Sequence, residues 1–128
     1  MKFLLENIVS RINRILNCYD TLLEYEKNGC TYEEIKKELL MIKNSNEELT
    51  PLMKTLFREH PNKIQGLATL AKIFKVTFIP TLKIHLLYLK QTEVQSNGLL
   101  KIQARLAITY LNVDGCIDNL RIIRSYLK

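Results

Sequence analysis

Several residue types that particular folds depend on are scarce in this sequence. Its 128 residues include no Trp, three Pro and four Gly. An all-β fold with many turns needs more Gly and Pro, so their scarcity counts against a sandwich or barrel. The length is near that of one ordinary domain, and 47% of the residues are hydrophobic, which is enough for one core. We therefore expect a single domain over residues 1–128.

Residues that metal and redox sites depend on are also few. The chain has an odd number of cysteines, Cys18, Cys30 and Cys116, and no pair has the spacing of a metal or redox motif. Reduced thiols are the simplest interpretation, and they indicate a cytoplasmic protein. The two histidines, His60 and His85, have no carboxylates at a spacing that would complete a metal site. We therefore predict no metal-binding residue and no cofactor.

The chemistry of phosphate-ester hydrolysis is not evident either. A phosphatase needs a nucleophile or metal ions, and donors for the charge of the transferred group. No cysteine lies in a glycine-rich phosphate loop or in a Cys-x5-Arg arrangement. The paired acids Glu33-Glu34 and Glu47-Glu48 are typical of solvated helix faces. The sequence therefore predicts no catalytic residue and no small-molecule substrate, and it favours a protein that is not an enzyme.

Long uninterrupted hydrophobic runs are absent from the sequence. The longest apolar-looking region, residues 67–89, is interrupted by Lys72, Lys75, Pro80 and Lys83. Each Lys near the centre of a membrane span costs about 2.5–3.5 kcal/mol. The first residues also lack the apolar core of a signal peptide. We therefore expect no membrane-spanning segment.

What the sequence does contain is apolar residues at intervals of three and four, which lie on one face of a helix. The first predicted helix covers residues 2–28, and Gly29 suits the left-handed residue that ends a helix. The second starts at Thr31, which with Glu34 fits a capping box. The predicted core residues of these two helices are Leu5, Ile8, Ile12, Ile15, Tyr19 and Leu22, then Ile35, Leu39, Ile42, Asn46, Leu49, Met53 and Leu56.

Prolines interrupt the second and third predicted helices. Pro51 lacks an N–H and disfavours helix at Thr50, so we expect a kink there, or two helices with a second start near Ser45. The third predicted helix covers residues 62–90 and should bend at Pro80. Its apolar residues are Ile64, Leu67, Ala71, Phe74, Phe78, Leu82, Leu86 and Leu89.

The fourth predicted helix follows a polar loop at residues 91–97. Gly115 weakens it by about 1 kcal/mol relative to Ala, but the apolar spacing keeps its register across the glycine, so we predict one continuous helix. Its predicted core residues are Leu99, Ile102, Leu106, Tyr110, Val113, Ile117, Leu120 and Leu127. The sequence thus predicts an all-α fold, an antiparallel bundle of about four long helices with kinks near Pro51 and Pro80.

The formal net charge of +6 is unevenly distributed. Residues 1–60 contain nine Lys and Arg against ten acids, whereas residues 61–128 contain ten against three. The third predicted helix presents a basic stripe, which is the candidate anion-binding site: Lys72, Lys75, Lys83 and Lys90. The stripe can contact phosphates of nucleic acid or of a membrane surface, or it can pair with the acidic half of the chain.

One segment resembles a known family. The dipeptide His60-Pro61 ends the second predicted helix, Phe78-Ile79-Pro80-Thr81-Leu82 follows in the third, and Leu87-Tyr88 comes a turn or so later. This order is similar to the central signature of the bromo-chloro-indolyl phosphate hydrolysis family, clearest over residues 52–88. The resemblance implies a helical fold and a link, by the family's name, to phosphate-ester hydrolysis. It brings no catalytic residues, and the basic final helix departs from the acidic one usual in the family.

Three functional hypotheses follow from these observations. The leading one is a non-enzymatic, cytoplasmic helical bundle that acts through protein–protein interaction, with an unknown protein partner, or through self-association as a homo-oligomer. The alternative is an anion-binding module that uses the basic C-terminal half to contact nucleic acid or an anionic membrane. A phosphatase is the hypothesis that the residue chemistry favours least.

Overall fold

The structure, a computed structural model, describes residues 2–59 and 97–127, and these residues are almost entirely α-helical. The helices are α1 (Lys2–Asn28), α2 (Tyr32–Glu59), α5 (Asn97–Leu111) and α6 (Cys116–Leu127), with the 3-10 turn η2 (Val113–Gly115) between the last two. The two described ranges contain no strand. The predicted all-α class is therefore confirmed.

Several sequence predictions fall outside these two ranges. They are the third helix over residues 62–90 with its bend at Pro80, the candidate lysines Lys72, Lys75, Lys83 and Lys90, and the histidines His60 and His85. They remain predictions.

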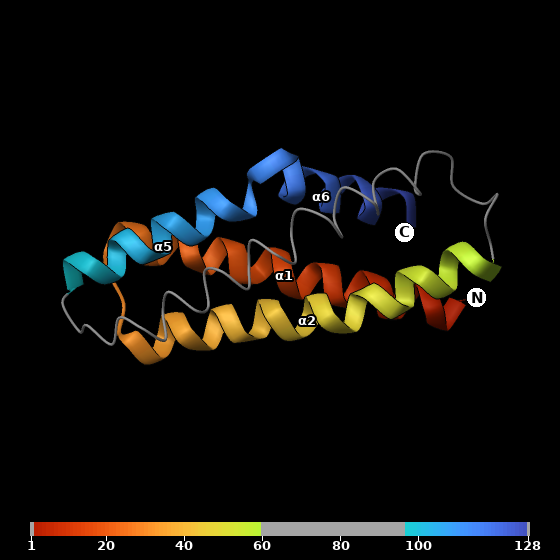
Figure 1. The fold of residues 1–128 in the computed structure, drawn as a ribbon, viewed down its shortest axis with the longest axis horizontal. Helices are drawn as coiled ribbons and strands as arrows, with labels where there is room; N and C mark the ends of the chain where they lie inside the picture. The colour runs from red at the N-terminus through yellow and green to blue at the C-terminus, as the bar shows by residue number, and fades with distance from the viewer. Residues whose placement is uncertain (1, 60–96, 128) are drawn as a thin grey trace.

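Helix α1 is the central element of the described part of the chain. It packs against α2 on one side and against α5 and α6 on another (Figure 1). Helix α2 runs back alongside α1, and α5 begins near the end of α1 at which α2 also begins (Figure 1). None of the described helices is both long enough and apolar enough to cross a membrane.

The turn between α1 and α2 follows the chemistry that the sequence predicts. Gly29 has a φ of 88°, in the left-handed region, and its N–H donates to the carbonyl of Tyr25 at 2.8 Å. The N–H of Thr31 donates to Glu34 Oε1 at 3.0 Å, and the N–H of Glu34 donates to Thr31 Oγ1 at 3.2 Å. This reciprocal pair is a capping box, which satisfies two amide groups at the start of α2.

Pro51 lies inside α2, which is one continuous helix rather than two. The predicted second start near Ser45 is therefore wrong. A proline inside a helix costs about 3 kcal/mol, but Leu49 and Met53 are buried on either side of it. Burying side chains of this size stabilises by about 1.5–3 kcal/mol each, which is enough to hold the helix together across the proline.

The core along α1 and α2 agrees closely with the predicted apolar stripes. Leu5 is only half-buried, where it packs against the core. The other predicted residues of these helices are buried: Ile8, Ile12, Ile15, Tyr19, Leu22, Ile35, Leu39, Ile42, Asn46, Leu49, Met53 and Leu56. The hairpin of α1 and α2 therefore buries the face that its sequence pattern indicates.

The last predicted helix is broken, contrary to the prediction of one continuous helix. Helix α5 ends at Leu111, and α6 begins only at Cys116. Gly115 has a φ of 72°, and its N–H donates to the carbonyl of Asn112 at 3.1 Å. A left-handed residue cannot continue a right-handed helix, so the chain changes direction at this glycine.

The break lets α5 and α6 bury different faces. The predicted core residues beyond it, Ile117, Leu120 and Leu127, are buried, but four predicted core residues before it are not: Leu99, Ile102, Leu106 and Tyr110. Val113, in the turn, is also only half-buried. The buried side chains of α5 are instead Leu100, Gln103, Ala104, Ala107 and Leu111. The predicted core face of α5 is therefore wrong.

Candidate interaction surface

Helix α5 has two apolar faces of different size. The inner face includes Ala104 and Ala107, which are buried, and α5 packs against α1. Small side chains allow two helix axes to approach closely. The outer face of α5 is defined here as Leu99, Ile102, Leu106 and Tyr110. It carries the larger side chains, yet it is the more exposed face.

The outer face of α5 is exposed over most of its length. Ile102 is 52% exposed, Leu99 43% and Tyr110 36%, while Leu106 is half-buried. These residues lie at intervals of three and four, so they form a continuous strip along the helix. A continuous apolar strip of this kind is typical of an interaction site, whereas single exposed apolar residues need no explanation.

Basic side chains accompany this strip. Lys101 and Arg105 are the only charged residues of α5, and the helix has no acidic residue. They are four positions apart, so two like charges lie on one side of the helix, which is mildly destabilising. Neither makes an ion pair with an acid in the described ranges.

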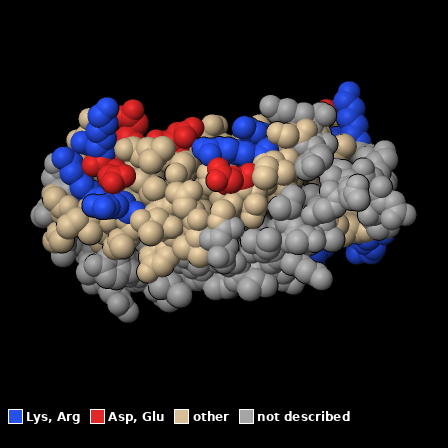
Figure 2. Space-filling model, turned by 90° about the horizontal axis from the view of Figure 1, so that it is seen from above, with Lys and Arg blue, Asp and Glu red and all other residues tan. Residues whose placement is uncertain are grey.

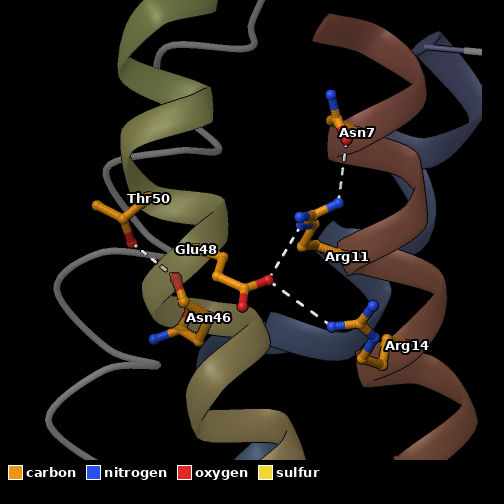
Figure 3. Close-up of polar contacts among 6 residues, drawn as sticks. All are labelled: Asn7, Arg11, Arg14, Asn46, Glu48 and Thr50. Atoms are coloured by element: carbon orange, nitrogen blue, oxygen red, sulfur yellow. Dashed lines mark hydrogen bonds and ion pairs between the residues drawn. The ribbon is translucent and has the colours of Figure 1, made fainter. Parts of the chain in front are cut away.

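Basic residues elsewhere are more often paired. Arg11 Nε lies 3.2 Å from Glu48 Oε2, and Arg14 Nη1 lies 3.7 Å from the same oxygen (Figure 3). The guanidinium of Arg11 also donates to Asn7 Oδ1 at 3.1 Å. These groups are partly exposed, so each pair stabilises the α1–α2 hairpin by only about 0.2–1 kcal/mol. Basic and acidic side chains are also interspersed on the face seen in Figure 2, rather than forming one basic patch.

The corner between α5 and α6 is tied to α1 by polar contacts. Asn112 Nδ2 donates to the hydroxyl of Tyr19 and to the carbonyl of Ile108, both at 2.9 Å. The guanidinium of Arg121 lies 6.0 Å from the centre of the Tyr19 ring, within cation–π range. Arg124 Nη1 donates to Asn13 Oδ1 at 3.0 Å. These contacts hold the corner that follows α5, and helix α6, against α1.

The cysteines in the hairpin are protonated at neutral pH. Burial, reinforced by a hydrogen bond to Glu38, raises the pKa of the Cys18 thiol from 9.0 to about 12. Burial, with the nearby carboxylate of Glu34, also raises the pKa of the Cys30 thiol. Because the thiolate is the nucleophile, a raised pKa opposes catalysis by either residue. The described residues also contain no group of three His, Cys, Asp or Glu side chains that could hold a metal ion.

A second surface feature is an open groove of about 930 Å³ beside the first half of α1. Its apolar lining includes Leu5, Val9 and Leu127, and its charged lining includes Lys2 and Glu6. This volume is near the upper end of the range for ligand pockets, but the groove is open to solvent along a helix surface and does not enclose a ligand. The mixed lining does not select one ligand chemistry, so the outer face of α5 is the stronger candidate site.

Two buried polar groups interrupt the core of α2. Ser45 is fully buried and Asn46 is 2% exposed, and neither Ser45 Oγ nor Asn46 Oδ1 has a hydrogen-bond partner in the described part of the chain. The hydroxyl of Thr50 donates to the backbone carbonyl of Asn46 at 3.0 Å (Figure 3), not to the side-chain oxygen Oδ1. A buried polar group without a partner costs about 1–3 kcal/mol. This part of α2 is therefore a local weak point.

The sequence did not identify the outer face of α5 as a surface. A second periodic set, Leu100, Ala104, Ala107 and Leu111, is the signal that indicates the buried face, and its two alanines make it the less hydrophobic of the two patterns. The candidate lysines of the third predicted helix lie outside the described residues. Comparison of the chain with family models, with curated proteins and with solved structures finds no match.

Proposed function

We propose that the protein acts by binding another polypeptide, or a second copy of itself, through the outer face of α5, and not by catalysis. The observation that carries this proposal is the exposure of Ile102 and Leu99, 52% and 43%, within a continuous apolar strip. Apolar surface of this kind gains free energy when another surface removes it from water, at about 25 cal/mol per Å².

The two-faced character of α5 supports the proposal. A helix with one apolar face can bury that face against one neighbour, whereas a helix with a second apolar face needs a second neighbour to bury it. Helix α1 covers the inner face through Ala104 and Ala107. The outer face has the larger side chains and the greater exposure, so it has the most to gain from a second neighbour.

We further propose the finer architecture that the sequence predicts, an antiparallel bundle of four helices with kinks near Pro51 and Pro80. The end of α2 and the start of α5 lie at opposite ends of the structure (Figure 1). Helix α2 has 28 residues, or about 42 Å at 1.5 Å per residue. A third helix over residues 62–90 would have a similar length and would return the chain across that distance.

A cytoplasmic location and membership of the bromo-chloro-indolyl phosphate hydrolysis family are part of the same proposal.

The proposed function is tested by comparing two exposed apolar positions, one on the outer face of α5 and one on α2. Ile102→Asp places a charge in the outer face of α5, and Leu40→Asp places one on α2, where Leu40 is 38% exposed. Proteins retained from the source cell by the unmodified chain should also be retained by Leu40→Asp and lost with Ile102→Asp. Sedimentation of the purified chain tests self-association with the same pair. Equal behaviour of the two variants would rule out α5 as the site.

The alternative function is anion binding by the basic stripe of the third predicted helix. The described residues carry nine Lys and Arg against ten acids in 2–59, and four against two in 97–127. They account for only +1 of the net charge of +6, so most of the excess lies with the rest of the chain, which includes Lys72, Lys75, Lys83 and Lys90. This concentration of charge favours a contact with phosphates.

Titration with duplex DNA and with anionic vesicles at two salt concentrations tests this alternative. Binding should weaken with salt, with a log–log slope near −0.9 for each phosphate contact on DNA. Lys72→Glu combined with Lys83→Glu should remove the binding and leave the helical content unchanged. No binding by the unmodified chain at low salt would eliminate the anion-binding function.

A further inference from the structure

The charges of α5 are all of one sign, and they lie beside its outer face. Arg105 is exposed and is three positions from Ile102, and Lys101 is four positions from Arg105 on the same side of the helix. Within the ranges that the structure describes, neither has an acidic partner. An acid placed beside this pair would relieve the repulsion between the two cations as well as pair with them.

We infer that the outer face of α5 binds an amphipathic helix of another protein whose apolar residues are flanked by Asp or Glu. This inference rests on the proposed function, since it names the partner of the same surface. Leu99, Ile102, Leu106 and Tyr110 lie at the spacing by which one helix contacts another along its length. Acidic residues beside the partner's apolar strip would then meet Lys101 and Arg105, in the way that flanking charges select partners in coiled coils.

A second copy of the chain fits this surface poorly. Two α5 helices packed face to face and antiparallel bring two pairs of cations to the same side of the interface, and in neither direction does α5 supply an acid to pair with them. Like charges placed opposite each other suppress a pairing. Some basic side chains of other described helices show the contrasting arrangement, since Arg11 pairs with Glu48 and Arg121 with Asp118.

An anionic membrane surface also fits less well. Recognition of anionic lipids typically uses clusters of about four to eight Lys or Arg residues. Helix α5 offers only Lys101 and Arg105. An acidic helix requires no more cations than α5 has.

The inference is tested with two synthetic peptides and the full chain. Both peptides are amphipathic helices about three heptads long with the same Leu and Ile strip, flanked by Glu in one and by Lys in the other. We expect the Glu peptide to bind in fluorescence anisotropy, and the Lys peptide to bind more weakly. Ile102→Asp should abolish binding of the Glu peptide.

Charge reversal sharpens the test. Lys101→Glu with Arg105→Glu should weaken binding of the Glu peptide by about five- to tenfold, as expected for two exposed ion pairs, and should make the Lys peptide the better ligand. The matched control is Lys37→Glu with Lys54→Glu, which makes the same change of net charge at exposed positions of α2. The control should leave both affinities unchanged.

Five outcomes would overturn the inference. Equal affinity for the two peptides, or binding of neither, would show that the face does not select an acidic partner helix. Self-association that Ile102→Asp abolishes would identify a second copy as the occupant, and binding to vesicles of anionic phospholipid that the same variant abolishes would identify a membrane. Self-association would leave the proposed function standing. A large loss of thermal stability in Ile102→Asp would instead mean that the chain itself covers the face, which contradicts the proposed function as well.

Discussion

The α1–α2 hairpin and the α5–α6 segment obey the same physical rules with different outcomes. In the hairpin, most of the large apolar side chains occupy one face, and that face is buried; the exposed ones, Phe3, Leu23 and Leu40, are isolated from one another in the sequence. In α5, the large side chains Leu99 and Ile102 are exposed, while Ala104 and Ala107 are buried. The difference shows that apolar periodicity identifies the buried face only when a helix has a single apolar face. Where there are two, the neighbour selects between them.

The two glycine turns make a second comparison. Gly29 and Gly115 both have positive φ, at 88° and 72°, and each ends a helix. Gly29 is followed by a capping box, so the sequence contains both the end of one helix and the start of the next. Gly115 lies within an apolar pattern that keeps its helical spacing on both sides of the glycine. That spacing predicts a continuous helix, so the turn cannot be read from the pattern.

The largest effect we expect is a difference in stability between the two regions when a large apolar side chain is shortened to Ala. Ile12 is fully buried in the hairpin, whereas Leu106 is half-buried on the outer face of α5. Ile12→Ala should lower the free energy of unfolding by about 2–5 kcal/mol, the usual cost of a large-to-small core change. Leu106→Ala should lower it by less than half as much. Urea denaturation measures both, and equal losses would mean that the outer face of α5 is part of the core.

The second prediction concerns the weak point within the hairpin. Asn46→Leu removes a buried amide oxygen that has no partner in the described residues, so it should raise the free energy of unfolding by about 1–3 kcal/mol. Asn44→Leu is the matched control, because Asn44 is exposed on the same helix. It should change stability by no more than about 0.5 kcal/mol. A loss of stability in Asn46→Leu would show that the amide has a structural role.

These comparisons also show how far the sequence determines the structure. Local signals predicted the first helix, its end at Gly29 and the capping box of Thr31 and Glu34, because each depends on neighbouring residues only. The contact between Arg11 and Glu48 joins residues 37 positions apart, and no local pattern specifies it. The same holds for the candidate site, since the face of α5 that is buried depends on its packing against α1, which is distant in the sequence.

The third prediction tests the turn at Gly115. A Cβ at this position would meet no atom within 4 Å, so any effect of substitution comes from the backbone conformation alone. Gly115→Ala should destabilise the protein by about 1–2 kcal/mol, the cost of a left-handed conformation for an ordinary residue. Gly115→Asn should cost less, because Asn adopts this conformation more readily. Identical thermal melts for the two variants would mean that the left-handed conformation is not maintained in solution.

The smallest expected effect is at the capping box, and it sharpens the contrast between the two turns. Thr31→Ala removes the oxygen that accepts from the N–H of Glu34 at 3.2 Å, and should cost about 1 kcal/mol. Asn112, which precedes η2, makes no such bond as a cap; its amide donates to Tyr19 instead. Thr31→Ser keeps an accepting hydroxyl and is the control for the loss of the cap. Because the cap acts on α2, hydrogen exchange should accelerate in its first turn more than around η2. Faster exchange spread evenly over both turns would mean that the hairpin and the C-terminal segment open together, so that the difference between them is one of packing geometry and not of local stability.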